Sequence, residues 1–115
     1  MIFEGEYLKG KRWNGKGKEY YNNGKLKFEG EYLNGERNGK GKEYKYELLE
    51  FEGEYLNGER SGKGKEYDID GKLKFEGEYL DGKRNGKGRT FFYNGILRFK
   101  GEYKNGINGM EMDMI

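Results

Sequence analysis

The chain has 115 residues, of which 22 are glycine, 11 tyrosine and 7 phenylalanine, and it contains no histidine, cysteine or proline. Its 23 lysine and arginine residues nearly balance its 21 aspartate and glutamate residues, so the net charge of +2 excludes the concentrated basic surface that nucleic-acid binding usually needs. The absence of cysteine excludes disulfides and thiolate sites, and no stretch approaches the roughly 20 apolar residues of a transmembrane helix. Because the first residues also lack the basic and apolar segments of a signal peptide, we expect a soluble, cytoplasmic protein.

One short motif, Phe-x-Gly-Glu-Tyr, recurs along the whole chain and divides it into units. It begins at Phe3, Phe28, Phe51, Phe75 and Phe99. Each of the first four copies is followed by a Gly-x-Gly segment, and the fifth unit is truncated. A fixed period indicates a repeat architecture. We therefore predict one domain over residues 1–115, with approximate repeats 1–25, 26–48, 49–72, 73–96 and 97–115.

The first predicted element of each unit is a β-strand that contains the motif. Residues 25–32 alternate apolar or small side chains with charged ones at a period of two, which is typical of a half-buried strand. A turn follows, because Asn34 and Gly35 readily adopt positive φ. A second strand over residues 39–44 then runs antiparallel to the first. The sequence therefore predicts an all-β chain of tandem hairpins.

The charged residues of the two strands predict the register of each hairpin. In the second unit we place Tyr32 opposite Gly39. The same register gives three further pairs: Gly30 with Gly41, Glu29 with Lys42, and Glu31 with Lys40. In the next two units it gives Glu52 with Lys65, Glu54 with Lys63, Glu76 with Arg89, and Glu78 with Lys87. Such pairs contribute only about 0.2 to 1 kcal/mol each, so they select the register more than they stabilise the fold.

The other face of the predicted sheet carries the repeated leucine, phenylalanine, glycine and tyrosine. Its predicted aromatic core consists of Phe3, Tyr7, Phe28, Tyr32, Phe51, Tyr55, Phe75, Tyr79, Phe99 and Tyr103. We assign Leu26, Leu49, Leu73 and Leu97 to the same face. Glycine in a strand packs nothing itself, so each repeated glycine implies that a neighbouring ring occupies its space. Residues 110–115 alternate methionine with acidic residues, and we predict that they form a capping strand.

The segments Phe28-Glu-Gly-Glu-Tyr32, Asn34-Gly35 and Gly39-Lys-Gly41 resemble the membrane occupation and recognition nexus (MORN) repeat, over residues 1–109. Residues 18–26 look more like the bacterial MORN-variant repeat. The resemblance implies an elongated, single-layer antiparallel β-meander that acts in scaffolding, dimerisation, peptide binding or phospholipid association, with no common catalytic activity. In this chain one aromatic residue comes a position later than in the usual repeat. Whether Tyr20, Tyr44 and Tyr67 face the core or the charged side is therefore open.

Catalysis is not expected from this residue inventory. Histidine and cysteine are absent, and Ser61 and Thr90 are the only aliphatic hydroxyls, so no triad or imidazole base can form. The glutamates recur in each repeat, whereas a carboxylate pair for catalysis needs contrasting environments. Residues 68–71 resemble the start of a calcium loop, but they lack the terminal glutamate and align with a turn. We expect no enzyme activity, metal or cofactor.

The predicted function is binding of a protein or peptide partner, or of a second copy, through the aromatic, glycine-floored face, because its rings need cover. The candidate partner-binding residues are Trp13, Tyr20, Tyr44, Tyr67, Phe92, Arg12, Arg37, Arg60 and Arg84. Trp13, in a one-residue insertion of the first hairpin loop, either anchors a partner or covers the first repeat. The four arginines recur in one turn, where they either contact anionic phospholipid, which is the alternative function, or are simply solvated.

Overall fold

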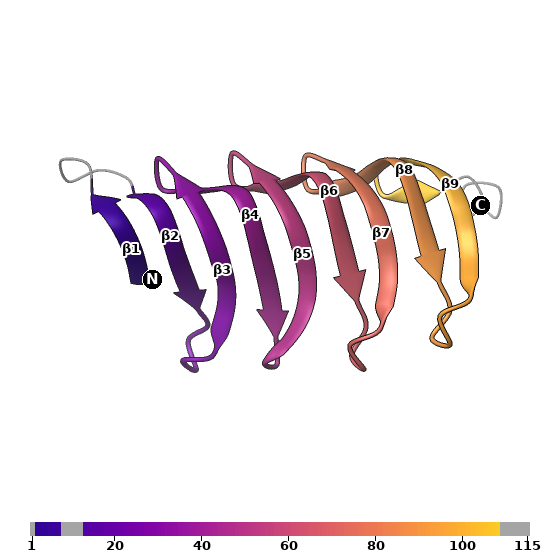
Figure 1. Ribbon diagram of the computed structural model, residues 1–115, viewed down its shortest axis with the longest axis horizontal. Helices are drawn as coiled ribbons and strands as arrows, with labels where there is room; N and C mark the ends of the chain where they lie inside the picture. The colour runs from indigo at the N-terminus through magenta and orange to yellow at the C-terminus, as the bar shows by residue number, and fades with distance from the viewer. Residues whose placement is uncertain (1, 8–12, 109–115) are drawn as a thin grey trace.

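The computed structural model describes residues 2–7 and 13–108. These residues form a single antiparallel sheet in which every strand lies beside its neighbours in the sequence (Figure 1). The strands are β1 (Ile2–Tyr7), β2 (Trp13–Tyr20), β3 (Leu26–Leu33), β4 (Glu36–Lys45), β5 (Leu48–Leu56), β6 (Glu59–Tyr67), β7 (Leu73–Leu80), β8 (Lys83–Phe91), β9 (Leu97–Lys104) and β10 (Ile107–Asn108). This arrangement confirms the predicted all-β meander of hairpins.

The sheet is elongated, with extents of 51 × 26 × 21 Å, and β1 and β10 lie at its opposite ends (Figure 1). No helix within the described ranges is long and apolar enough to cross a bilayer. The predicted capping strand, residues 110–115, lies outside the described residues.

Two-residue turns close the hairpins at one long edge of the sheet. Asn34 and Gly35 have φ of 53° and 80°, as the Asn-Gly prediction requires. Each turn also bonds to the preceding repeat: the Gly58 N–H donates to the Arg37 carbonyl at 2.9 Å. Neighbouring repeats are therefore joined through their turns as well as through their strands.

The predicted register is correct in one half of each hairpin and wrong in the other half. Gly30 lies opposite Gly41, as predicted. The predicted pairs Glu29 with Lys42, Glu52 with Lys65, and Glu76 with Arg89 are also confirmed. Tyr32, however, lies opposite Arg37, because the chain around Gly39 bulges out with a φ of 95°.

The bulge changes what the second glutamate of each unit does. Glu54 does not pair with Lys63 in its own hairpin. Its side chain instead accepts a hydrogen bond from the Lys63 backbone N–H at 2.7 Å, and its cross-strand neighbour is Lys40 of the preceding repeat. The predicted pairs Glu31 with Lys40 and Glu78 with Lys87 are wrong for the same reason, since those carboxylates also bind backbone N–H groups.

A second irregularity moves the leucines off the aromatic face. Glu43 lies opposite Phe51, and Tyr44 lies opposite Leu49, so Glu50 has no partner on β4. This extra residue shifts the alternation of side chains between the two faces of β5 by one position. Cross-strand partners share a face, which places Leu49 with Tyr44. The prediction was therefore wrong that the aromatic face includes Leu26, Leu49, Leu73 and Leu97. Each of these leucines lies opposite the displaced aromatic residue of its neighbouring strand, which comes one position later than in the usual repeat: Tyr20, Tyr44, Tyr67 or Phe91.

The buried core consists of the predicted aromatic rings. Phe28, Phe51 and Phe75 are fully buried, and they pack with Tyr32, Tyr55, Tyr79 and Tyr103. We call this set the aromatic layer. Phe99 is partly buried against it. Nothing is described for the side chains of Phe3 and Tyr7.

Candidate binding groove

The aromatic layer is closed by the protein itself. The Phe51 ring meets Tyr55 and Tyr79 edge to face, with centroids 5.7 and 5.1 Å apart. The guanidinium of Arg60 covers the same ring, 4.0 Å from its centroid. A Cβ atom on Gly64 would lie 2.6 Å from two atoms of the Phe51 ring, so the glycine makes room for that ring, as predicted.

A partly buried polar ladder fixes the covering arginines. Arg60 donates two hydrogen bonds to Glu43, at 2.8 and 3.1 Å, and the Tyr55 hydroxyl donates to the same carboxylate. Arg37 with Glu19, and Arg84 with Glu66, repeat this arrangement. In the fourth repeat Thr90 takes the place of the glutamate. Its hydroxyl is buried and has no hydrogen-bond partner among the described residues.

The ladder shifts the pKa values of its members. Burial alone would raise the pKa of Glu43, but hydrogen bonds from Arg60 and Tyr55 outweigh this effect and hold the pKa below its ordinary value. Burial and the hydrogen bond to Glu43 together raise the pKa of the Tyr55 hydroxyl. The ladder is thus built from a carboxylate, a guanidinium and a neutral phenol.

The opposite face carries a groove of about 1620 Å³ that crosses the strands from β2 to β9. Its floor is the backbone of the repeated glycines, whose missing side chains would point into the aromatic layer. Its other lining residues are Lys16, Lys18, Glu29, Glu31, Lys40, Lys42, Glu52, Glu54, Lys63, Lys65, Glu76, Glu78, Lys87, Arg89, Lys100 and Glu102. Gly41, Gly64 and Gly88 are buried, and Gly30, Gly53, Gly77 and Gly101 are partly exposed. The groove therefore offers partly accessible main chain and charge, but no ring.

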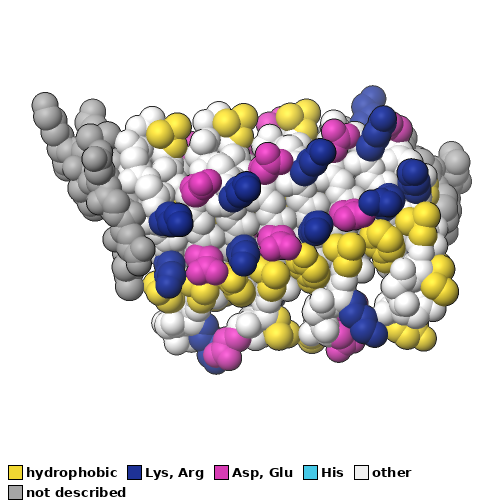
Figure 2. Space-filling model, in the orientation of Figure 1, with side chains coloured by type: hydrophobic (Ala, Val, Ile, Leu, Met, Phe, Trp, Pro, Cys, Tyr) yellow, Lys and Arg dark blue, Asp and Glu magenta, His cyan; other side chains and the backbone are white. Residues whose placement is uncertain are grey.

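The charges of the groove alternate from strand to strand, as the rows of Lys, Arg and Glu in Figure 2 show. The acidic pair of β5, Glu52 and Glu54, is flanked by the basic pairs of β4 and β6. Glu52 lies opposite Lys42 on one side and Lys65 on the other. Each stripe is thus balanced by its neighbours, and the groove is nearly neutral along most of its length.

The repeat geometry agrees with the family comparison. A sequence profile described as MORN repeat matches residues 28–46, 51–72 and 75–96, and one described as MORN repeat variant matches residues 13–34. The chain belongs to the MORN-repeat family. A search of curated proteins found no match to it. MORN repeats typically serve in binding and scaffold roles and are associated with both protein and membrane-lipid partners.

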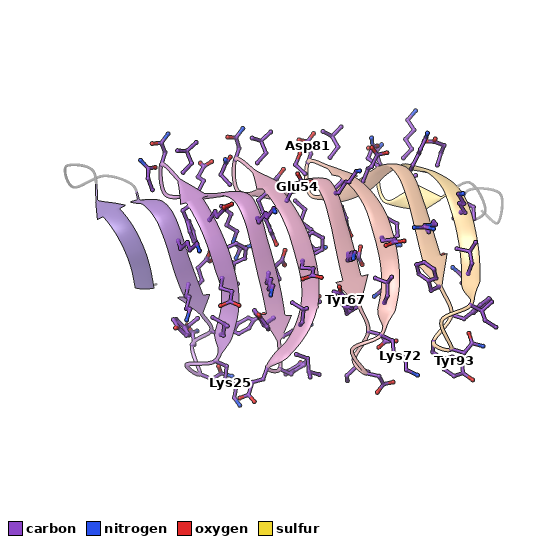
Figure 3. All side chains as sticks on the ribbon, in the orientation of Figure 1. Lys25, Glu54, Tyr67, Lys72, Asp81 and Tyr93 are labelled. Carbon is purple, nitrogen blue, oxygen red and sulfur yellow. The ribbon has the colours of Figure 1, made fainter. Side chains whose placement is uncertain are left out.

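In this MORN-repeat chain the displaced tyrosines face the charged side. The Tyr44 hydroxyl donates to Glu29 at 2.7 Å, and the Tyr67 hydroxyl donates to Glu52 at 2.5 Å. Burial and these hydrogen bonds raise the pKa of each hydroxyl to about 12. Figure 3 shows Tyr67 toward the long edge of the sheet that also holds Lys72 and Tyr93. The question that the sequence left open is thereby answered for these two residues.

The other aromatic candidates lie at the same edge or have undescribed side chains. Tyr20 is opposite Leu26 and partly exposed. The position equivalent to Tyr67 in the fourth repeat is Phe91, opposite Leu97, whereas the predicted Phe92 is an exposed residue that follows β8. Trp13 is the first residue of β2, opposite Tyr7, and not a loop residue. Its side chain is outside the described set.

The arginine candidates have a different place from the one predicted. Arg37, Arg60 and Arg84 lie in strands, not in turns, and their side chains cover the phenylalanine rings. They are ion-paired to glutamates and only 19 to 22% exposed. An anionic headgroup would therefore have to displace a bound carboxylate to reach them. Arg12 is outside the described residues.

The residues that resemble a calcium loop form a turn, as predicted. Asp68 Oδ1 accepts hydrogen bonds from the backbone N–H groups of Asp70, at 2.9 Å, and Lys72, at 3.0 Å. This carboxylate thus shapes the loop between β6 and β7.

Sequence reasoning did not identify the groove, although it named nearly all of its charged residues. It treated them as a lattice of cross-strand pairs and placed the binding surface on the aromatic face. The signal that was available is the repeated glycine. Such a glycine belongs to the face where a ring occupies its space, so its position presents only main chain on the other face.

Proposed function

We propose that this MORN-repeat chain is a non-enzymatic binding module and that its groove holds an extended segment of a partner protein. The observation that supports this most directly is the continuous glycine floor between the two rows of charges. The aromatic rings, which we first considered as the contact surface, are not accessible, since Phe28, Phe51 and Phe75 are fully buried.

The chemistry of the lining suits a polypeptide. The floor presents only main chain to an occupant, because the side-chain direction at Gly53 and Gly64 points into the aromatic layer, and charged side chains stand on both sides of it. Alternating lysine and glutamate can pair with side chains of either sign on the occupant. Such exposed pairs contribute little energy each but specify the partner and its register. We therefore expect binding that depends on the charge sequence of the partner and weakens with salt.

Matched charge reversals test this proposal. The groove variant is Lys42→Glu/Lys65→Glu, in which both lysines are exposed and line the floor. The control is Lys27→Glu/Lys74→Glu, in which both lysines are also exposed but lie outside the groove lining. The two variants change the net charge equally. Any effect of overall charge on binding is therefore the same in both.

The measurement is selection of a random-peptide display library against the full chain, followed by affinity determination for the enriched peptides. We expect enriched peptides to bind the control variant as they bind the unmodified chain, and to bind the groove variant about tenfold less tightly. Failure to enrich any peptide, or equal loss of affinity in both variants, would overturn the groove as the binding surface.

A further inference from the structure

The alternation of charge in the groove is broken at one strand. On β3, β5 and β7 both groove side chains are glutamates, but on β9 the first of the two positions is Lys100, and only Glu102 remains acidic. The equivalent residues Glu29, Glu52 and Glu76 each lie opposite basic residues. Lys100 instead lies opposite Arg89, so two cations face each other across the strands.

Among the described residues, only the Arg89 half of this like-charge pair has an ion-pair partner. Arg89 is ion-paired to Glu76 on its other side. The described part of β10 pairs only with Tyr103 and Lys104, so it brings no carboxylate to Lys100. Like charges directly opposite each other destabilise a sheet. A glutamate at this position, as in the other four repeats, would remove that repulsion, so stability alone does not explain the lysine.

The break makes the groove electrically asymmetric. Its lining has nine basic side chains and seven acidic ones, a net charge of +2, and with a glutamate at position 100 there would be eight of each. The excess positive charge lies between β8 and β9, where Lys87, Arg89 and Lys100 are all exposed. One end of the groove thus differs from the rest.

We propose that Lys100, with Arg89 and Lys87, binds an acidic side chain of the partner segment and so fixes the direction in which that segment lies. This inference rests on the proposed function of the groove. A peptide carboxylate fits better than an anionic membrane surface, because the cations stand beside the glycine floor formed by Gly88 and Gly101. An extended chain can lie along that floor, whereas a flat bilayer meets the rims of a groove first.

The test compares two charge reversals on one strand. Lys100→Glu restores the repeating pattern. Arg98→Glu changes the net charge by the same amount at an exposed position outside the groove lining, where the residue has no partner on β8. The probe is a short glycine–serine peptide with one central pair of glutamates, and the same peptide with two glutamines is its control. Amide chemical shifts of the isotope-labelled full chain report where each peptide binds.

We expect the glutamate peptide, at low ionic strength, to shift the amides of Lys87, Arg89 and Lys100, and the glutamine peptide to leave them unchanged. Lys100→Glu should weaken binding about fivefold or more, while Arg98→Glu should retain about the original affinity. Lys100→Glu should also unfold at a denaturant concentration no lower than the unmodified chain, since it removes a repulsive pair.

Several results would overturn the inference. They are equal binding by the two variants, a lower unfolding midpoint for Lys100→Glu, equal shifts from inorganic phosphate at the same concentration, or Lys100-dependent binding to phosphatidylserine vesicles without peptide binding. If a peptide shifts residues elsewhere in the groove, such as Lys42 and Lys65, but not Lys100, the proposed function stands and only this inference fails. If no peptide shifts any groove residue, both fail.

Discussion

Replacing Gly53 by alanine should disrupt the sheet at the contact between β5 and β6. An added Cβ would lie 2.6 Å from the Gly64 Cα and 2.6 Å from the Lys63 carbonyl oxygen. Both atoms are backbone, and Gly53 lies directly opposite Gly64 in the ladder. Relief therefore requires the two strands to separate, whereas a side-chain clash is relieved by a change of rotamer.

The expected cost is the upper part of the range for overpacking, about 3 kcal/mol of the free energy of unfolding. Alanine also reduces the conformational entropy of the unfolded chain, and this offsets about 0.4 to 1 kcal/mol of the packing cost. The net loss should be about 2 kcal/mol or more. Because stability in a repeat array is nearly a sum of neighbour terms, the loss should appear in the cooperative transition of the central repeats.

Gly58→Ala is the matched control. Gly58 lies in the next turn with a φ of 89°, and an added Cβ would meet nothing within 4 Å. Its cost is therefore conformational and should be about 1 to 2 kcal/mol. Urea unfolding of both variants, followed by circular dichroism, gives the two free energies. If Gly53→Ala is no more destabilising than Gly58→Ala, the packing role assigned to the strand glycines is wrong.

Three further predictions concern the buried ladder and the displaced tyrosines. Because the pKa of Glu43 is lowered in the folded state, the free energy of unfolding should fall as pH drops below the unfolded carboxyl pKa of about 4.3. In urea titrations at several pH values, Glu43→Gln should make this fall smaller. An unchanged dependence on pH would count against the ladder. The pKa of Tyr67 is raised to about 12, so the free energy of unfolding should fall as pH rises above the unfolded phenol pKa of about 10. Tyr67→Phe should reduce this fall at alkaline pH. Equal dependence of the two free energies on pH would contradict the hydrogen bond to Glu52. Thr90→Val removes a buried hydroxyl without a described partner and should raise the free energy of unfolding by about 1 kcal/mol; a decrease would mean that the hydroxyl is satisfied.

The sequence predicted the fold well because the repeat reports the same local rule several times. The strand around Phe28 and the Asn34-Gly35 turn are local signals, and the structure confirms both. The alternation breaks at Lys27, which has no partner on β2. The bulge at Gly39 was missed because a glycine in a strand pattern has two interpretations, close packing and positive φ. Gly41 follows the first interpretation and Gly39 the second.

The places of the charged side chains were harder to predict. Arg60 was predicted to lie in a turn, either solvated or in contact with a partner. It covers Phe51 instead, because a guanidinium can stack on a ring and bind a carboxylate at once. Its partner Glu43 comes from the preceding repeat, 17 residues away. No pattern within one repeat indicates such a contact. The exception at Lys100, by contrast, is visible in the sequence alone, as Phe-Lys-Gly-Glu-Tyr among copies of Phe-Glu-Gly-Glu-Tyr.

The core and the groove depend on the same glycines. At Gly41 a Cβ would collide with the Phe28 ring, at 2.5 Å, so packing of the core forbids a side chain there. On the opposite face the same positions present only main chain, because their side-chain direction points into the core. The glycines therefore cannot change without disrupting the core, while the exposed lysines beside the floor contribute little to stability and can change freely. Any difference in partner choice between chains of this architecture should therefore be found in those charges, and Lys100 is the position where this chain already departs from its own repeat.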